Sequence, residues 1–308
     1  DFIDNVPSDE VASVINNADF HVDDQLGNYC VAFNVNDKMF DGMSAEDAAT
    51  LRHALGILID RGYIAENIGQ TGQKVATAFV PDGMSDGNGG IFREDDYDYP
   101  DADSHGYYTA EYDFDAAKAE ATELLESIGY KFNDDGTLSD ENPISVEYLI
   151  NENTAHQAIA EAIQSDWSSI GVDVTIKTEE WDTFLNDRKA GAFSIAREGW
   201  IADYDDPINM LEIFTSDSGN NDAQLGKNPE NSATPDWTAY DNLISEIRTT
   251  TDNTARVQML HQAEDKLVGE DSVLAPIYFY TQKYMLADGI KGLYCCPLGY
   301  FFFGYTHQ

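Results

Sequence analysis

The sequence predicts an α/β fold, and three observations carry this prediction. Strand-like and helix-like segments alternate through the middle of the chain, with lengths suited to parallel β-α-β crossovers. Apolar residues make up 42% of the 308 residues, which is enough for a sizeable buried core. No apolar run approaches the ~18 residues of a membrane-spanning helix. We therefore expect a parallel-rich sheet flanked by helices, in one or two domains.

The first third of the chain is expected to form a strand and two helices. Residues 29–35 are rich in β-branched and aromatic side chains, which is typical of a strand. A helix is predicted after Ser44, a possible N-cap with Asp47 three residues on, and it carries its apolar residues on one face. Gly62 and Gly69 bracket a second helix at 63–68, and residues 81–83 form a turn.

The segment 82–111 is long, acidic and rich in turn residues. A loop of this length inside a compact domain is usually functional or poorly ordered. Residues 101–106 resemble the opening of an EF-hand calcium loop, but Tyr112 stands at the twelfth position, with Glu111 one residue short. We therefore expect a solvated surface loop rather than a calcium site.

The middle of the chain has the most regular pattern. Strands are predicted at 144–150, 172–178 and 192–196, and helices at 115–128, 155–170 and 180–189. Gly129 and Gly171 end the first two of these helices. The three strands are expected to lie parallel in one sheet, because a helix separates each from the next.

The last third is expected to be mainly helical before the chain returns to the sheet. Helices are predicted at 208–214, 237–248 and 253–268, and a late strand at 274–280. The tail from Tyr294 to Tyr305 is aromatic and glycine-rich, so it must pack against something.

The charge of the chain excludes several kinds of partner. The 57 acidic residues outnumber the 17 Lys and Arg residues, which gives a formal net charge of −40. Binding to nucleic acid or to an anionic membrane surface requires clustered basic residues, so neither is expected. The balance suits a highly soluble, self-repelling protein outside the cell.

The cysteines and histidines show no metal-ligand or catalytic spacing. Cys30 stands alone and Cys295 and Cys296 are adjacent, so a structural zinc site is not expected. One bridge from Cys30 to that pair is an alternative to three unpaired buried thiols, which we favour. The sequence has no HExxH, GxSxG or phosphate-binding loop motif, and we interpret the six histidines as surface or structurally satisfied residues. We expect no catalytic residues, metal or cofactor.

The segment after the third predicted strand is the best candidate for a binding site. In an open α/β sheet, ligands bind beyond the carboxyl ends of parallel strands. This segment carries a bidentate cation (Arg197), a glycine that permits close backbone approach (Gly199), an indole (Trp200) and an anion (Asp203). These residues suit a zwitterionic ligand, because the cation can bind a carboxylate, the anion can bind an ammonium and the indole can form an aromatic wall. The alternative is that Trp200 belongs to the core and Asp203 caps the next helix.

Five segments, in order, resemble one family: the oligopeptide-binding proteins of peptide ABC importers, extracellular solute-binding protein family 5. The run Gly-Trp-Ile-Ala-Asp-Tyr at 199–204, with Ser-Gly-Asn-Asn at 218–221, is similar to the ligand-site region of these receptors. The other matches are the helix at 51–61, the turn at 79–84, the helix and turn at 117–136, and the C-terminal pattern at 256–264 and 275–278. The resemblance covers about residues 29–281.

The resemblance implies a receptor that binds oligopeptides without chemistry, built on a periplasmic-binding-protein-like (type II) lobe. It implies that Asp203 pairs with the α-ammonium of the peptide and that Arg197 lines the cleft. Glu198 departs from the family, in which a small residue is more usual, and adds negative charge beside the site. The other candidate contacts are Gly199, Trp200, Ile201, Asn220, Tyr278 and Tyr280.

The resemblance also implies the organisation of the whole protein. Residues 1–35 are expected to end a first lobe and form a hinge strand, 36–273 to form the second lobe, and 274–308 to return toward the first lobe, whose main part is absent from this chain. Two lobes would close over the peptide, and the permease subunits of the importer would recognise the closed, monomeric receptor. The expected location is extracytoplasmic, as a cell-surface lipoprotein or in the periplasm.

Two different functions are also compatible with the sequence. A receptor of the same fold could carry another cargo, namely a nickel chelate, a sugar or an opine, although Ala-Asp-Tyr after Gly-Trp favours peptide. An extracellular hydrolase is disfavoured, because the sequence shows no catalytic constellation.

Overall fold

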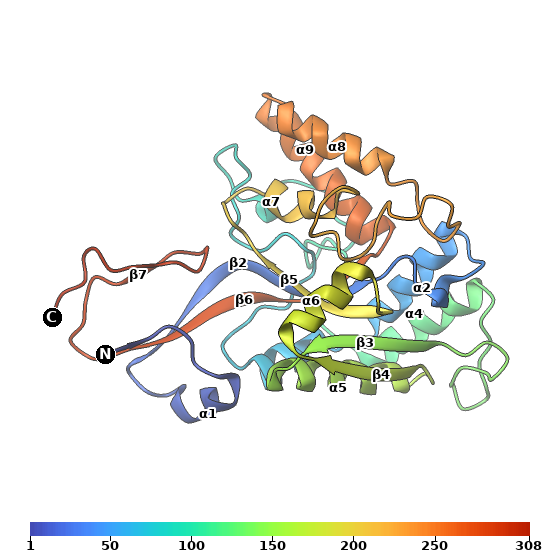
Figure 1. Cartoon of the computed structure of the whole chain (residues 1–308), viewed down its shortest axis with the longest axis horizontal. Helices are drawn as coiled ribbons and strands as arrows, with labels where there is room; N and C mark the ends of the chain where they lie inside the picture. Colours follow the sequence, from blue (N-terminus) through green and yellow to red (C-terminus); the bar gives the residue numbers. More distant parts are fainter.

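A computed structural model describes residues 1–308. Six strands form one mixed sheet in the order β1-β6-β2-β5-β3-β4, and two short strands form a separate hairpin. Helices cover both sides of the sheet, and the two chain ends lie at the same end of the molecule (Figure 1). The strands are β1 (Phe2–Ile3), β2 (Phe20–Phe33), β3 (Ser145–Asn151), β4 (Asp173–Glu179), β5 (Ile195–Ile201), β6 (Leu274–Leu286), β7 (Tyr294–Cys295) and β8 (Phe301–Phe302).

The helices begin and end close to the predicted positions, because local signals set their ends. Ser44 Oγ accepts a hydrogen bond from Asp47 N at 3.1 Å at the start of α2, as its sequence predicts. Gly129 and Gly171 adopt positive φ just after α4 and α5, which confirms both as helix ends. The helices are α1 (Val11–Val14), α2 (Ala45–Ile57), α3 (Arg61–Tyr63), α4 (Phe114–Ser127), α5 (Thr154–Ser168), α6 (Trp181–Ala190), α7 (Ile208–Leu211), α8 (Thr238–Thr249) and α9 (Asn253–Glu264).

Two of the predicted helices contain π-helical turns. The predicted helix at 63–68 starts as α3 and continues as a π-helix over Ile64–Gly69. The predicted helix at 253–268 ends its α-helical part at Glu264 and continues as a π-helix over Asp265–Glu270. The wider turns extend both helices beyond the end of their regular i, i+4 hydrogen bonding.

The three middle strands confirm the predicted parallel arrangement, and the rest of the sheet is antiparallel. β3 pairs parallel with β4 along its whole length and with β5 at two positions. β2 lies at the centre and pairs antiparallel with both β5 and β6. The strands predicted at 29–35 and 274–280 are therefore both present, but each is longer than expected. β2 and β6 run together away from the helices as a long two-stranded extension (Figure 1).

Alternation along β2 divides the core into two clusters, one on each face of the sheet. Tyr29, Val31 and Phe33 point into a cluster completed by α2, α4 and α5. Cys30 and Ala32 point into the other, which α8, α9 and the segment 78–108 complete. Two-residue periodicity in a strand that is covered on both faces produces this three-layer arrangement.

The segment 82–111 is not simply the solvated loop that its acidic residues predict. Phe92, Tyr99, Tyr107 and Tyr108 are buried in the second core cluster. The Tyr107 hydroxyl donates to Asp265 Oδ1 at 2.7 Å at the end of α9. Aromatic residues spaced between acidic ones thus anchor the segment, while most of the acidic residues between them face water.

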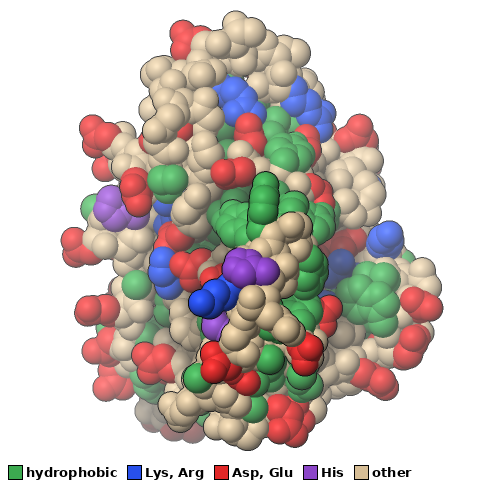
Figure 2. Space-filling model, turned by 90° about the vertical axis from the view of Figure 1, so that its left-hand side faces the viewer, with side chains coloured by type: hydrophobic (Ala, Val, Ile, Leu, Met, Phe, Trp, Pro, Cys, Tyr) green, Lys and Arg blue, Asp and Glu red, His purple; other side chains and the backbone are tan.

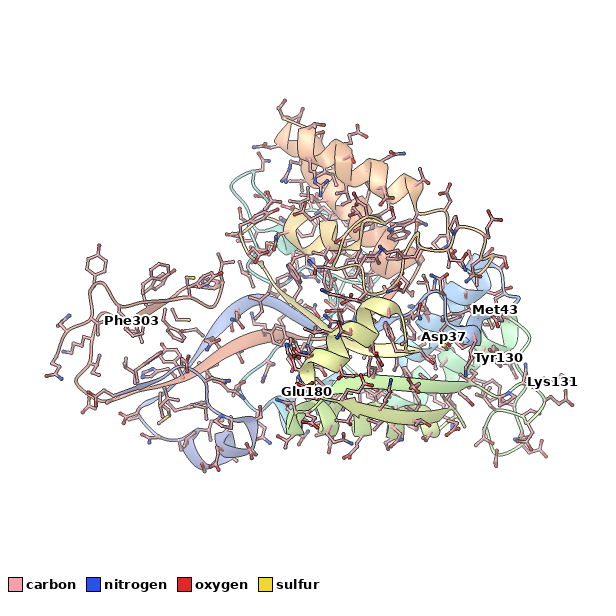
Figure 3. The ribbon with its side chains drawn as sticks, viewed as in Figure 1. Asp37, Met43, Tyr130, Lys131, Glu180 and Phe303 are labelled. Atoms are coloured by element: carbon pink, nitrogen blue, oxygen red, sulfur yellow. The ribbon has the colours of Figure 1, made fainter.

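The aromatic tail is only partly buried. Residues 294–305, called here the aromatic arm, carry the β7–β8 hairpin and project from the end of the β2–β6 extension (Figure 1). Phe301 and Phe303 pack against Phe2, with ring centroids 4.9 and 5.2 Å apart, and Figure 3 shows Phe303 on this arm. The arm nevertheless exposes Tyr294, Tyr300, Phe302 and Tyr305. Hydrophobic side chains gather at the centre of this end of the molecule (Figure 2).

The three cysteines are unbridged, as favoured from the sequence, but only Cys30 is buried. Cys295 and Cys296 are half-buried in the aromatic arm, which corrects the expectation of three buried thiols. No helix of the structure combines the length and the apolar character that crossing a membrane requires.

Candidate ligand-binding site

The candidate segment lies inside a strand rather than beyond one. β5 runs from Ile195 to Ile201, whereas the sequence predicts a strand at 192–196. Arg197 to Ile201 therefore belong to β5, and Asp203 is the candidate that follows the strand. The strand continues through charged residues because neighbouring elements supply partners for them: Arg197 Nε donates to Asn151 Oδ1, and Glu198 pairs with Arg188.

One edge of β5 has no strand beside it in this region. β2 pairs with β5 from Gly27 to Phe33, but β3 pairs only with Ile195 and Ala196. Ala202 N donates to Leu26 O at 2.8 Å, so the even-numbered residues direct their backbone groups toward β2. The carbonyl of Gly199 and both backbone groups of Ile201 consequently point to the unpaired edge. An extended ligand backbone could pair there as an added strand.

Asp203 is held in place without using its charge. Its backbone N–H donates to Asn209 Oδ1 at 2.8 Å, and its Oδ2 accepts from Asn209 Nδ2 at 3.4 Å. The side chain does not cap α7; Asp206 Oδ1 accepts from Ile208 N instead. The capping alternative for Asp203 is therefore wrong, and its exposed carboxylate forms no ion pair.

The two neighbouring acids connect the end of β5 to other parts of the chain. Asp205 Oδ1 accepts from Ser85 N at 2.8 Å, which ties the strand end to the segment 82–111. Asp206 forms an ion pair with Arg256 of α9 at 2.9 Å. Asp206 is therefore neutralised by a cation, whereas Asp203 and Asp205 are exposed and form no ion pair, and Asp203 is the one of these two that lies next to β5.

Arg197 is a buried cation without a carboxylate partner. Its residue is 9% exposed, and its Nε donates to the neutral amide of Asn151 at 2.8 Å. Its guanidinium carbon lies 5.6 Å from the ring centroid of Trp181 and 5.2 Å from that of Phe184. A buried charge is costly unless it is paired, so this guanidinium is suited to an anionic ligand group.

Tyrosines from β2 and β6 lie near the guanidinium. Tyr29 of β2 stacks on Tyr278 of β6 with centroids 5.1 Å apart, and Tyr280 meets both edge-on. Burial is the largest cause that raises the pKa of Tyr29 and of Tyr278 well above the ordinary value, while Arg197 opposes the rise in both. These hydroxyls therefore stay neutral and offer hydrogen bonds rather than charge.

Gly199 is required where it stands because Tyr280 approaches it closely. A Cβ atom on Gly199 would overlap the Tyr280 hydroxyl oxygen and would lie 3.0 Å from the carbonyl oxygen of Asn28. The glycine thus brings the aromatic ring against the backbone of β5. Trp200, on the opposite face, donates through Nε1 to Asn209 Oδ1 at 3.1 Å and packs partly against the second core cluster.

The structure places most of the candidate residues on neighbouring strands, with Trp200 on the opposite face of β5 from Arg197, Gly199 and Ile201. Six candidates lie on the strands β5 and β6, which flank β2, namely Arg197, Gly199, Trp200, Ile201, Tyr278 and Tyr280. Asp203 follows directly after β5. Asn220 stands apart, in the exposed polar loop after α7, and its side chain makes no hydrogen bond to any of the others. Glu198, which departs from the family pattern, is buried and neutralised by Arg188 at 3.0 Å.

Three further residues belong to the site and were missed from the sequence. Asn209 holds both Trp200 and Asp203. Trp181, 48% exposed, stands beside Arg197 at the start of α6. His156, in the first turn of α5, lies against Tyr29, and its buried Nδ1 has no hydrogen-bond partner.

His156 therefore differs from the satisfied histidine that the sequence predicts. Burial is the largest cause that lowers its pKa to about 3, with Arg197 second, so the ring is neutral at neutral pH. A neutral ring with a free nitrogen next to a cation can share a carboxylate with that cation. The described residues include no cluster of ligands suited to a metal ion.

Comparisons with known proteins show the family of this chain. Residues 1–222 match the family profile described as bacterial extracellular solute-binding proteins, family 5 Middle. The chain belongs to that family. It is 30% identical over 292 residues to the oligopeptide-binding protein OppA of Bacillus subtilis, covering 94% of this chain and 46% of OppA. It is also 30% identical over 297 residues to the dipeptide-binding protein DppE of the same organism, covering 96% of this chain and 48% of DppE.

A solved structure shows the same fold. The murein tripeptide binding protein MppA of Escherichia coli superposes with a TM-score of 0.74 at 25% identity, covering 97% of this chain and 51% of MppA. The chain thus spans about half the length of the relatives it matches.

Proposed function

We propose that this protein is an extracytoplasmic receptor that binds oligopeptides and delivers them to an ABC importer, without chemistry of its own. The observation that carries the proposal is the pair of unsatisfied opposite charges at β5. Arg197 is a buried cation with no carboxylate partner, and Asp203 is an anion with no cationic partner. A free peptide is a zwitterion whose ends complement both.

The spacing of the two charges suits a short extended peptide. Six residues of extended backbone span at most about 20 Å, and each residue of an extended peptide spans ~3.3 Å. The unpaired edge of β5 lies between the two charges and offers the Gly199 carbonyl and the Ile201 backbone groups. Hydrogen bonds between the peptide backbone and that edge would give affinity that does not depend on the side chains of the peptide. We therefore expect acceptance of varied side chains, with selectivity set by the two peptide ends.

The proposed roles follow from position. Asp203 binds the α-ammonium, and Arg197, aided by neutral His156, binds a carboxylate. Trp200, Ile201 and Trp181 provide apolar walls beside them. The named activities of OppA and DppE support a peptide as cargo over a sugar, an opine or a nickel chelate.

We further propose that this chain supplies one of two lobes that close over the peptide. Residues 36–273 would be that lobe, and 1–35 and 274–308 would lead through the β2–β6 extension to the other. The aromatic arm, with exposed Tyr294, Tyr300, Phe302 and Tyr305, would pack against that other lobe. The closed receptor would act as a monomer that permease subunits recognise, at the cell surface as a lipoprotein or in the periplasm.

The test is a calorimetric comparison of matched ligands on the whole protein. Free pentapeptides and hexapeptides, whose extended lengths of roughly 17–20 Å match the span from Arg197 to Asp203, should bind, whereas their N-acetylated and C-amidated forms should bind much more weakly, because each lacks one charge. Sugars and nickel chelates should not bind. Equal affinity for free and doubly blocked peptides, or binding only of a sugar or chelate, would overturn the proposal.

A further inference from the structure

A cavity lies away from the proposed peptide site. It holds about 350 Å³ and lies between α2, α4 and the segment 100–113. None of the residues assigned to the peptide site lines it. Its volume is at the lower end of the range for small-molecule sites and corresponds to roughly a dozen water molecules.

A buried cation without a counterion forms part of the cavity lining. Arg61 is 4% exposed and forms no ion pair. Its Nε donates to Pro276 O at 2.6 Å and its Nη1 to Ile59 O at 3.3 Å, while Nη2 has no hydrogen-bond partner. Burial lowers the pKa of Arg61 to about 10, so the guanidinium remains charged at neutral pH. A buried charge of this kind is best satisfied by an anionic group.

Tyrosine rings and aliphatic side chains form the apolar part of the wall. The Arg61 guanidinium carbon lies 4.1 Å from the centroid of the Tyr108 ring, which fixes the plane of the cation. The Tyr112 hydroxyl donates to Leu58 O at 2.7 Å, so that ring is fixed as well. Ile57 and Ile59 complete the apolar surface.

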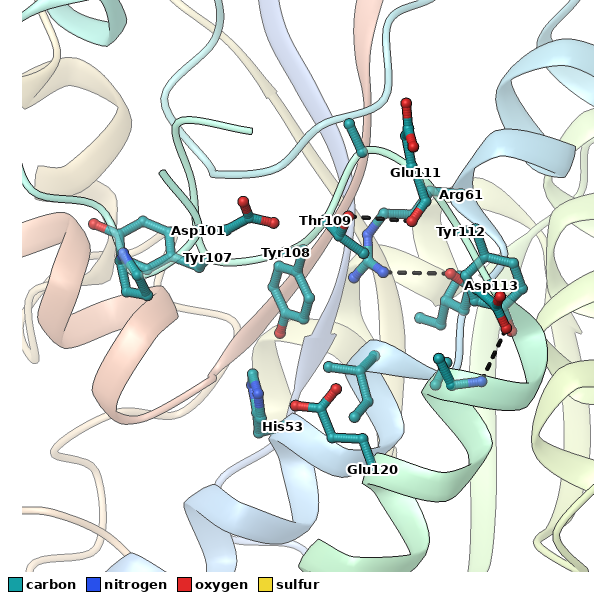
Figure 4. Close-up of a pocket in the computed structure, with 16 residues that line it drawn as sticks. His53, Arg61, Asp101, Tyr107, Tyr108, Thr109, Glu111, Tyr112, Asp113 and Glu120 are labelled. Atoms are coloured by element: carbon teal, nitrogen blue, oxygen red, sulfur yellow. Dashed lines mark hydrogen bonds between the residues drawn. The ribbon is translucent and has the colours of Figure 1, made fainter. Parts of the chain in front are cut away.

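Four carboxylates line the cavity, and one of them faces Arg61 from the opposite side. Figure 4 shows Glu120, from α4, on the side of His53 and across the cavity from Arg61. Glu111, Asp113 and Asp101 also line the cavity. This arrangement disfavours a simple anion, which the carboxylates would repel, and a simple cation, which Arg61 would repel. It favours a molecule that carries both charges.

We propose that this cavity is a second ligand site that binds a free α-amino acid with an apolar side chain. The carboxylate of the amino acid meets Arg61, its ammonium faces Glu120, and its side chain lies against Ile57 and Tyr108. The site is independent of the peptide site, because the two share no residue.

Calorimetric titration of the 308-residue chain with three matched probes tests the proposal. L-leucine carries both charges, isocaproate lacks the ammonium and isoamylamine lacks the carboxylate. Leucine should bind with a dissociation constant below about 10 mM, and each analogue should bind at least about tenfold more weakly. Equal binding of all three probes, or no leucine binding up to about 10 mM, would overturn the proposal.

Four variants locate the site at which leucine binds. Ala116→Phe fills the cavity from α4 and should abolish leucine binding while the circular dichroism spectrum stays unchanged. Glu120→Gln should weaken leucine by about fivefold or more without weakening isocaproate, whereas Glu126→Gln, a matched change on α4 outside the cavity, should alter neither. Asp203→Asn should leave leucine binding unchanged. Loss of leucine binding in Asp203→Asn, or its survival in a folded Ala116→Phe chain, would contradict the assignment.

Discussion

The amide of Asn209 holds Asp203 from two directions: Oδ1 accepts from the Asp203 backbone N–H at 2.8 Å, and Nδ2 donates to the carboxylate at 3.4 Å. Asn209 is buried and also accepts from the Trp200 indole. One side chain thus fixes the position of the anion and of the aromatic wall while leaving the negative charge unneutralised. In the proposed complex, the ligand ammonium would meet a preorganised carboxylate, which would reduce the entropy lost on binding.

Replacing Asp203 should affect free peptides selectively. Asp203 is exposed in this chain, but closure of a second lobe over the peptide, as proposed, would bury its pair with the ligand ammonium. Truncating one partner of a buried charge pair costs roughly 2–5 kcal/mol, largely because the other charge is left unpaired. In the whole protein, Asp203→Asn should weaken free peptides by about two orders of magnitude. N-acetylated peptides, which have no ammonium to leave unpaired, should be weakened far less. Titration of both ligands against both proteins yields the coupling energy.

Asp205 provides the matched control for this experiment. Asp205→Asn removes a carboxylate two residues away whose oxygen accepts from Ser85 N. It should weaken free and acetylated peptides equally and only slightly. If Asp203→Asn behaved in the same way, Asp203 would have no role in ammonium recognition.

Removing the Asn209 amide should destabilise the fold as well as the site. Asn209→Ala leaves the Trp200 indole N–H and the Asp203 N–H without their shared acceptor. An unsatisfied buried donor costs about 1–3 kcal/mol, so urea unfolding should show a loss of that order. In a Trp200→Phe background, one of the two donors is already absent, and the additional loss should be smaller. Strictly additive losses would show that Asn209 does not act through the indole.

The residues of the site differ in how far the sequence reveals them. Trp200 and Asp203 stand in a short motif, Gly-Trp-Ile-Ala-Asp-Tyr, so they can be chosen as candidates directly from the sequence. Asn209 lies in a short helix with no distinguishing pattern, and its role exists only because the chain folds back on β5. His156 is one polar residue among several on α5, and only its burial beside Tyr29 distinguishes it.

The fold was predictable where local signals agree with tertiary packing. The caps at Ser44, Gly129 and Gly171 act locally, so those helix ends follow from the sequence. The extent of β5 did not follow from the sequence. Arg197 and Glu198 are compatible with a strand only because Asn151 accepts a hydrogen bond from Arg197 and Arg188 pairs with Glu198. The burial of segment 82–111 was hidden for a related reason, since its acidic residues outweigh its widely spaced aromatic ones.

The contact between Gly199 and Tyr280 should resist enlargement of the glycine. Gly199→Ala introduces a methyl group that overlaps the Tyr280 hydroxyl, and overpacking of this kind costs about 1–3 kcal/mol. Tyr280→Phe removes that hydroxyl, so Gly199→Ala should cost less in the Tyr280→Phe background. Gly219→Ala is the control, because a Cβ atom there meets nothing within 4 Å. Equal costs in both backgrounds, measured by urea unfolding, would contradict the proposed contact.

His261 should make the protein less stable as the pH falls. Burial, followed by the charge of Arg93, lowers the pKa of this histidine from 6.5 to about 4. Between pH 6.5 and 4 the unfolded chain binds the proton more readily, so the free energy of unfolding falls as the pH falls through this range. The full loss from this group is at most about 3 kcal/mol, reached below pH ~4.

Three substitutions check this pH dependence. His261→Gln should reduce the loss of stability between pH 6.5 and 4, whereas His307→Gln, at an exposed residue, should not. Asp95 Oδ2 lies 3.4 Å from His261 Nε2 and favours the protonated ring. Asp95→Asn should therefore increase the loss on acidification. The same pH profile in His261→Gln as in the unaltered protein would exclude His261 as the cause.

Salt should stabilise the protein, because its surface repels itself. The net charge is −40, and Arg52, Arg61, Arg93 and Arg197 are buried, so few cations lie among the surface carboxylates. Raising sodium chloride from about 0.01 M to about 0.5 M shortens the Debye length from roughly 30 Å to under 10 Å. The melting temperature should then rise by several degrees, as scanning calorimetry can measure. A neutral osmolyte at equal osmolarity should not reproduce the same rise.

The stabilisation by salt should become smaller near pH 4.1, the isoelectric point of the sequence, where the net charge is close to zero. A melting temperature independent of salt at neutral pH would show that the acidic surface does not limit stability.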